Sequence, residues 1–408
     1  MTTTESTTPV LTSSEEALRT AHALAADIAA GAVERELNGI WPEEELRRVG
    51  ESGLLGIIVP ARFGGPDLPR ATAVEVLRIL SQADSAVGQL LLAHFVLNQA
   101  ITGLEDAAPA PQIYRDVLAG AQLGNATVER GTKTSVERRT TVTRQPDGRW
   151  VLNGTKYYAT GTLGAEWIAV AARIPELDHG ATVFVRPTDP GVTLNLDRWS
   201  SFGQKGTASG EVVFDNVPVE DDFVIDEGPD PDPVTAPPGV LGAFDQALHA
   251  AVDIGIARAA LEDGAKFVTT KSRPWFEAGV DNAADEPHVV RRFGELTARL
   301  YALEALLAQG ASRVDEALAL PEITREAAAE ASLKVAAAKA LAQEFAVEIA
   351  SGVFELAGAS ATDHKYALDR HWRNVRVHSL HDPARWKYVH LGNYTLRGTK
   401  PPKLGVLL

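Results

Sequence analysis

The feature that most constrains this chain is the order in which its hydrophobic periodicity changes. Apolar residues recur at helical spacing from about residue 13 to 120, and again in long Ala- and Leu-rich segments after residue 241. Short β-branched or aromatic runs separated by turn residues lie between them. This order predicts a mainly α protein with a central β domain. We expect an N-terminal helical domain at 1–122, an antiparallel β domain at 123–227, a linker or loop at 228–240 and a C-terminal helical bundle at 241–408.

The helical segments have recognisable start and stop signals. Ser13 precedes two glutamates as a capping residue should, and Gly53 follows the segment 43–52. We expect further N-terminal helices at 71–80 and 86–104, the last of them central because it is mostly apolar. In the bundle we expect three long helices and a fourth from Ala367 onward, the long ones at 241–270, 288–316 and 323–352.

The central segment has the pattern of short strands joined by tight turns. Asp and Gly residues near positions 147, 178 and 189 mark the turns. The Pro-rich stretch 228–239 can hold neither a helix nor a central strand. The strands are expected at 150–158, 167–172, 181–185, 192–196 and 210–214.

Composition excludes several classes of protein. The 408 residues include no cysteine, which removes disulfide-stapled scaffolds, thiolate nucleophiles and Cys-ligated metals. The net charge of −15 repels nucleic acid. Apolar stretches such as 90–97 are shorter than the roughly 18–20 residues of a membrane span. The polar start, residues 1–8, lacks the pattern of a signal peptide, so we expect a frayed tail and a cytoplasmic protein.

Three segments resemble signatures of the acyl-CoA dehydrogenase family. Residues 52–65 (SGLLGIIVPARFGG) are similar to its N-terminal signature, and residues 153–161 (NGTKYYATG) and 210–219 (GEVVFDNVPV) to its β-domain signatures. The resemblance runs from about residue 15 to the C-terminus. It implies a flavin ring between the β domain and the C-terminal bundle, in a homotetramer.

The catalytic glutamate of that family is missing from both of its usual positions. Acyl-CoA dehydrogenases use it to remove the proton α to a thioester, which needs a carboxylate close to the substrate. The corresponding loop, residues 376–387 (RVHSLHDPARWK), contains no Glu, and the position on the first bundle helix falls near Gln246. An FAD-dependent acyl-CoA dehydrogenase or oxidase is therefore an alternative only with a displaced carboxylate, such as Asp245, Asp253 or Glu129.

The loop instead resembles that of the flavin-dependent monooxygenases that share this fold, the dibenzothiophene monooxygenase-like group. The segment 378–383 (HSLHDP) carries the resemblance. It implies a two-component enzyme in which a separate reductase supplies reduced FMN, with FAD as the less favoured cofactor. O₂ would form a flavin hydroperoxide that oxygenates a small, fairly apolar substrate at sulfur, nitrogen or aromatic carbon.

The same resemblance implies which residues act at the flavin. His381 matches the histidine beside the reactive face, and an imidazole with an ordinary pKa near ~6.5 can move protons near neutral pH. Asn125, whose amide donates and accepts, and Thr160, with its hydroxyl, are expected beside the ring as catalytic and flavin-binding residues. His94 is expected to line the pocket as a fourth catalytic residue. For His94 the alternative is an ordinary buried histidine. For Asn125 it is a turn residue, and for Thr160 a strand residue.

Three more residues are implied to bind the cofactor. Trp199 is expected to flank the flavin, and His378 to support His381 from the same loop. Arg273 matches an arginine that reaches the flavin phosphate of a neighbouring subunit, a role that suits its forked donors. Packing is the alternative role for Trp199, and a helix-end surface position is the alternative for Arg273.

No metal and no nicotinamide site are expected. The glycines at 203 and 206 lack both the spacing and the strand-to-helix context of a dinucleotide fingerprint. His364, His371 and His390 lack metal-ligand spacing. A ligand-binding homologue without flavin or catalysis is a further alternative. The sequence does not identify the substrate, because relatives with the same motifs can oxidise different molecules.

Overall fold

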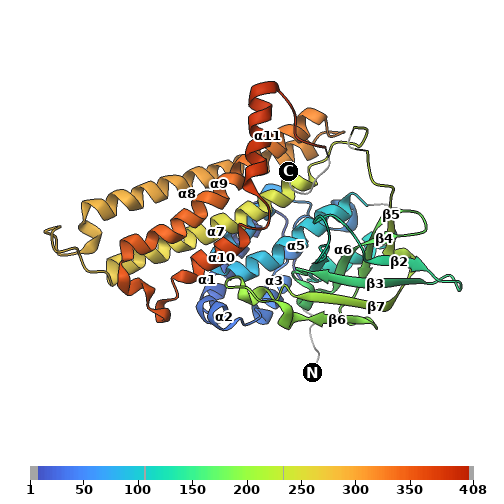
Figure 1. Cartoon of the computed structure of the whole chain (residues 1–408), viewed down its shortest axis with the longest axis horizontal. Helices are drawn as coiled ribbons and strands as arrows, with labels where there is room; N and C mark the ends of the chain where they lie inside the picture. Colours follow the sequence, from blue (N-terminus) through green and yellow to red (C-terminus); the bar gives the residue numbers. More distant parts are fainter. Residues whose placement is uncertain (1–7, 105–106, 233, 404–408) are drawn as a thin grey trace.

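The order of elements follows the predicted sequence of helices, strands and helices (Figure 1). The structure is a computed structural model that describes residues 8–104, 107–232 and 234–403. The expected N-terminal tail lies, apart from Thr8, outside these residues. Among the described residues, no helix is both long enough and apolar enough to cross a bilayer.

The N-terminal helices begin and end where local signals place them. The Ser13 hydroxyl accepts a hydrogen bond from the Glu16 N–H at 3.2 Å, and Gly53 adopts a left-handed φ of 84° directly after the predicted helix end. Two short helices, α2 and α6, were not predicted, because seven and nine residues give little periodicity. The helices are α1 (Ser14–Ala29), α2 (Ala32–Asn38), α3 (Glu43–Glu51), α4 (Arg70–Ala83), α5 (Ser85–Thr102) and α6 (Ala110–Leu118).

The central sheet is mostly antiparallel, as predicted, and its strands lie in the order β6-β7-β3-β2-β4-β5-β8, with β1 beside β4. β1 runs parallel to β4, which corrects the wholly antiparallel expectation. The reason is that the β2–β3 hairpin separates these two strands in sequence, and parallel partners need such a long connection. The strands are β1 (Leu123–Ala126), β2 (Thr141–Arg144), β3 (Trp150–Tyr157), β4 (Trp167–Ile174), β5 (His179–Val185), β6 (Val192–Asn195), β7 (Glu211–Val219) and β8 (Val224–Gly228).

The C-terminal bundle contains the three predicted long helices, α7 (Leu241–Thr270), α8 (Pro287–Leu318) and α9 (Arg325–Ala357). The single fourth helix expected from Ala367 is wrong. It is two helices, α10 (Asp369–His378) and α11 (Ala384–Arg397), separated by the loop 379–383. Pro383 explains the break, because proline lacks an N–H and disfavours helix at the preceding residue.

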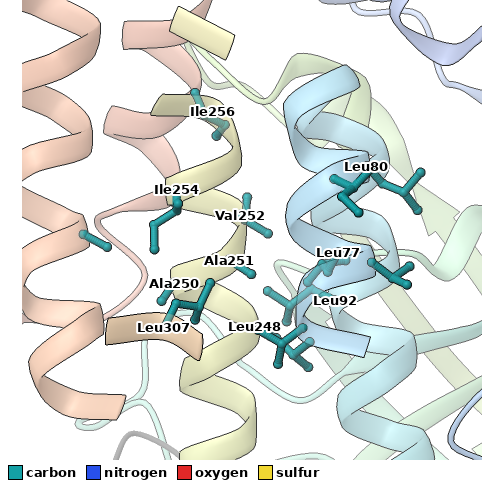
Figure 2. Packing of buried hydrophobic residues seen from close by; sticks show 14 of the residues in the cluster. Leu77, Leu80, Leu92, Leu248, Ala250, Ala251, Val252, Ile254, Ile256 and Leu307 are labelled. Carbon is teal, nitrogen blue, oxygen red and sulfur yellow. The ribbon is translucent and has the colours of Figure 1, made fainter. Parts of the chain in front are cut away.

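α7 runs through the middle of the helical core. Figure 2 shows its residues 248–256 between Leu77 and Leu80 of α4, Leu92 of α5 and Leu307 of α8. A helix surrounded in this way must be apolar or small on all sides. Gly255 illustrates the constraint, since a Cβ there would lie 2.5 Å from the Arg78 carbonyl oxygen. The N- and C-terminal helices therefore share one core, whereas the sheet has its own.

Candidate active site

Three histidines meet where α7 passes the break between α10 and α11. His249 of α7 lies 3.1 Å from His378, measured between Nδ1 and Nε2. The His249 ring also stacks on that of His381, with centroids 3.8 Å apart and planes inclined by 27°. His249 and His378 are buried, whereas 42% of the His381 side chain is exposed. The structure thus brings the predicted pair His378 and His381 together through a third histidine that sequence reasoning missed.

A buried ion pair lies behind these histidines. Asp253 of α7 accepts from Lys339 Nζ at 2.7 Å with one oxygen, and its other oxygen lies 2.7 Å from His378 Nδ1. Burial alone would raise the pKa of Asp253, but the Lys339 ammonium and His378 lower it below its ordinary value. The carboxylate is therefore ionised and accepts only, so His378 donates from Nδ1.

The loop that carries His381 is held at both of its ends. Gln343 of α9 donates from Nε2 to the carbonyl oxygens of Ser379 and Asp382, at 2.8 Å in each case. The Asp382 carboxylate pairs with Lys387, and its Oδ1 lies 3.5 Å from His381 Nδ1. These contacts fix the backbone on either side of His381.

A further carboxyl group, that of Asp245, lies one helical turn before His249. Its Oδ1 is 3.6 Å from His249 Nε2, and its Oδ2 accepts from Gln246 Nε2 at 3.0 Å. Burial raises the pKa of Asp245 to about 6. A carboxyl group with this pKa can hold a proton beside the histidines near neutral pH.

The predicted residues of the sheet also lie together. The Asn125 N–H donates to the Thr160 carbonyl oxygen at 3.1 Å. The Thr160 hydroxyl contacts the Ser209 hydroxyl at 2.9 Å, and Ser209 donates to Thr207 at 2.9 Å. The Asn125 amide oxygen accepts from the Thr127 hydroxyl. This row of hydroxyls and amides comes from β1 and from the loops after β3 and before β7, and it offers both donors and acceptors.

The turn after Trp199 connects this row to the histidines. Trp199 is half-buried and donates from Nε1 to the Gln204 carbonyl oxygen at 2.9 Å. The Gln204 N–H donates at 2.7 Å to the Asn374 side chain, one helical turn before His378 on α10. The Gln204 side chain is buried, and its amide oxygen and nitrogen have no hydrogen-bond partner within the described parts of the chain. An unpaired buried amide is costly, so this position fits a bound polar molecule.

The contacts of His94 differ from those of the pocket-lining residue that we expected. It is fully buried on α5, and its Nε2 lies 2.8 Å from the Leu55 carbonyl oxygen while its Nδ1 accepts from the Leu123 N–H at 3.1 Å. Burial lowers the pKa of His94 to about 4, so the ring stays neutral near pH 7. Both nitrogens are occupied by backbone groups. The geometry therefore gives His94 a structural role and offers no nitrogen for catalysis.

Arg273 is not brought to the other predicted residues within one chain. It is exposed in the loop after α7, at the end of the bundle farthest from the sheet (Figure 1). Its expected contact with flavin is thus possible only in the site of another copy of the chain. Among the described residues, no group of three or more His, Asp or Glu side chains is arranged to hold a metal ion.

Several site residues were missed because no local signal marks them. His249, Lys339 and Gln343 lie in long apolar helices, far from the quoted motifs. A charged lysine within an Ala-rich helix is the one available hint, because a buried ammonium needs a buried carboxylate. Which carboxylate that is depends on how α7 and α9 pack.

Comparison with known proteins matches the three parts of the chain in order. Residues 12–104, 125–217 and 247–386 match the N-terminal, middle and C-terminal domain models of acyl-CoA dehydrogenase. A dibenzothiophene monooxygenase of Rhodococcus qingshengii is 33% identical over 93% of both chains. The chain belongs to the acyl-CoA dehydrogenase family.

Other members of the acyl-CoA dehydrogenase family are similar along the whole chain. The probable FMNH2-dependent monooxygenase SfnC of Pseudomonas putida is 30% identical over 96% of this chain and 98% of its own length. The FMN-bound structure of TdsC from Paenibacillus sp. A11-2 superposes with a TM-score of 0.88 at 31% identity. It covers 96% of this chain and 100% of TdsC.

Each of the three carboxylates that could replace the missing glutamate already has a side-chain partner. Asp253 is committed to Lys339 and His378. Glu129 accepts from Lys156 Nζ at 2.6 Å and from the Thr140 N–H at 2.9 Å. Asp245 accepts from Gln246 Nε2 at 3.0 Å with one oxygen, and its other oxygen faces His249 at 3.6 Å. The structural arrangement and the named relatives therefore favour the monooxygenase function over the dehydrogenase alternative.

Proposed function

We propose that this chain is the oxygenase component of a two-component, FMN-dependent monooxygenase. The observation that carries the proposal is the His249–His378–His381 cluster, built partly from the loop that the family resemblance matches to the loop of the missing glutamate. The names of two relatives support it, dibenzothiophene monooxygenase and probable FMNH2-dependent monooxygenase. A separate reductase would supply the reduced flavin, and O₂ would be the second substrate.

The residues at the edge of the sheet fit FMN. An isoalloxazine ring has carbonyl and N–H groups on one edge, which need donors and acceptors together. Asn125, Thr160 and the unpartnered Gln204 amide would provide them, and Trp199 would flank the ring. FMN supplies the electrons and the activation of O₂ when it is bound. FAD is the less favoured alternative, because TdsC and SfnC are named with FMN.

His381 is the residue to which we assign proton transfer. It is the exposed member of the histidine cluster, and imidazole can both take and release a proton near neutral pH. His378 would support it through His249. The substrate would be a small, fairly apolar molecule, and sulfur is the favoured site of oxygenation because dibenzothiophene names the enzyme of R. qingshengii. TdsC has also been solved with FMN and indole together, which keeps nitrogen or aromatic carbon as the second candidate.

We further propose that the chain forms a homotetramer. α11 exposes a set of large apolar side chains that a single chain leaves uncovered. A loop beside Arg273 does the same with Trp275 and Phe276, which are 60% and 79% exposed. Contact between copies would cover these surfaces and bring Arg273 to the FMN phosphate of a neighbour. The exposed large apolar residues of α11 are Trp386, Tyr388, Val389, Tyr394 and Leu396.

The function is tested by mixing chemically reduced FMN, the protein and O₂ with dibenzothiophene or indole as probes. We expect a product that contains one atom of ¹⁸O from ¹⁸O₂. His381→Ala should bind reduced FMN nearly as the wild type does. Its product yield should fall by ~10²–10⁴, the usual contribution of a positioned acid or base, with H₂O₂ released instead.

The matched control is His179→Ala, which removes a half-buried histidine of β5 that pairs with Asp226 of the neighbouring strand β8. Its product yield should equal that of the wild type. Oxidation of acyl-CoA thioesters with a dye acceptor, without oxygenation of either probe, would contradict the proposal. An unchanged yield in His381→Ala would remove this histidine from the mechanism.

A further inference from the structure

We propose that His249 is a positioning residue for His381, locked by the buried chain Lys339–Asp253–His378 and presenting its ring as the surface against which His381 stacks. The part that concerns catalysis rests on the proposed function. The part that concerns orientation rests only on the contacts of the cluster.

The buried chain determines which nitrogen of each histidine carries hydrogen. Asp253 is ionised because it pairs with Lys339, so His378 must donate to it from Nδ1. Burial lowers the pKa of His378, and lowers that of His249 well below the ordinary value, so both rings are neutral. His378 Nε2 is then an acceptor, and His249 must donate to it from Nδ1. With both rings neutral, this is the assignment that satisfies all three contacts.

This assignment holds the plane of the His249 ring. Rotation of the ring would break the hydrogen bond to His378 and leave two buried nitrogens unpaired, which is costly. The opposite edge of His249 faces Asp245 at 3.6 Å. His249 therefore presents one fixed, uncharged face, and His381 lies on that face with centroids 3.8 Å apart.

His381 is bounded on one face and along one edge. His249 covers the face, and Asp382 lies 3.5 Å from its Nδ1 on the edge. Gln343 holds the backbone of the loop on both sides of it. Its Nε2 has no hydrogen-bond partner among the described residues, so this is the atom available to a bound molecule.

Two substitutions separate the ring of His249 from its hydrogen bond. His249→Phe keeps an aromatic ring and loses the hydrogen bond to His378, whereas His249→Gln keeps an N–H donor and loses the ring. The readout is the rate at which diethyl pyrocarbonate modifies His381, followed by mass spectrometry without any turnover. We expect His249→Gln to raise this rate about 2- to 10-fold, as loss of an aromatic pair allows, and His249→Phe to leave it unchanged.

Turnover gives the second readout. In His249→Gln the product yield per reduced FMN should fall about 10²-fold, the cost of a misplacement of about 1 Å, with KM unchanged. His249→Phe should retain most of the wild-type yield. His378→Gln breaks the chain one link earlier. It leaves the His249 N–H without its imidazole acceptor, so the His249 ring can turn toward another partner and the modification of His381 should also become faster, whereas the apolar ring in His249→Phe has no N–H to satisfy. His378→Gln keeps the test possible if His249→Gln does not fold.

The control is His371→Gln, which removes another buried histidine, one that pairs with Asp263 outside the cluster. It should match the wild type in both readouts. An unchanged modification rate in His249→Gln and His378→Gln, or an equal rise in His249→Phe, would overturn the positioning role. A wild type that oxygenates no probe would overturn the proposed function instead, because the modification rates would still decide how His381 is held.

Discussion

Asp245 holds a carboxyl group in surroundings where a negative charge is costly. Its pKa is raised from 3.8 to about 6 in the folded chain. The folded chain therefore binds this proton more tightly than the unfolded chain, and protonation stabilises the fold. This contribution is complete below about pH 3.8 and is lost as the pH rises through about 6. Asp245→Asn keeps an acceptor for Gln246 and removes the cost of ionisation, which amounts to at most about 3 kcal/mol at about 1.4 kcal/mol per pKa unit.

We therefore expect Asp245→Asn to unfold at the same temperature as the wild type near pH 4 and at a higher temperature near pH 8. Thermal unfolding of both proteins across this range is the measurement. If the difference in unfolding temperature does not change with pH, folding does not raise the pKa of Asp245.

At the scale of elements, His94 joins three pieces of the chain. From α5 it contacts the backbone of the Leu54–Gly56 turn and of β1, so it ties the helices to the sheet. His94→Leu leaves the buried Leu55 carbonyl and Leu123 N–H without partners. At about 1–3 kcal/mol for each group, we expect a loss of about 2–6 kcal/mol in the free energy of unfolding. Urea denaturation measures it.

The alternative outcome for His94→Leu is a protein of wild-type stability that binds reduced FMN but gives no product. That result would restore the catalytic role that the family resemblance implied. His288→Leu, which removes a histidine at the exposed start of α8, controls for the substitution itself and should change neither property.

At the scale of the whole molecule, the uncovered apolar side chains predict assembly. Light scattering at micromolar concentration should report four copies of the chain. Leu396→Glu on α11 should reduce the measured mass of the assembly, because it places a charge on a surface that we expect to be covered. An active wild-type monomer would contradict the assembly.

Arg273→Ala should weaken the binding of FMN more than that of riboflavin, by about 10- to 100-fold if a charge-assisted contact is lost.

The sequence by itself determined the class of fold and most of its elements, and it supplied candidate residues for the site. Periodicity placed the long helices because their apolar faces repeat over many turns, as in α7, α8 and α9. Local motifs marked five residues. Asn125 contacts Thr160, and His378 and His381 both contact His249. The turn after Trp199 reaches α10 through the hydrogen bond from Gln204 to Asn374. Short elements such as α2 and β2 were missed, because a few residues do not establish a period.

Only the tertiary structure decided which side chains act on one another. His94 and His249 are both histidines in apolar helices, and nothing local distinguishes them. Packing gives His94 two backbone partners, and it gives His249 a hydrogen bond to His378 and a stacked ring. In the same way, Asp253 and Lys339 are 86 residues apart and become a pair only when α7 and α9 lie side by side. Burial then makes these pairings obligatory, because a polar group removed from water needs a partner that only the folded chain can bring to it.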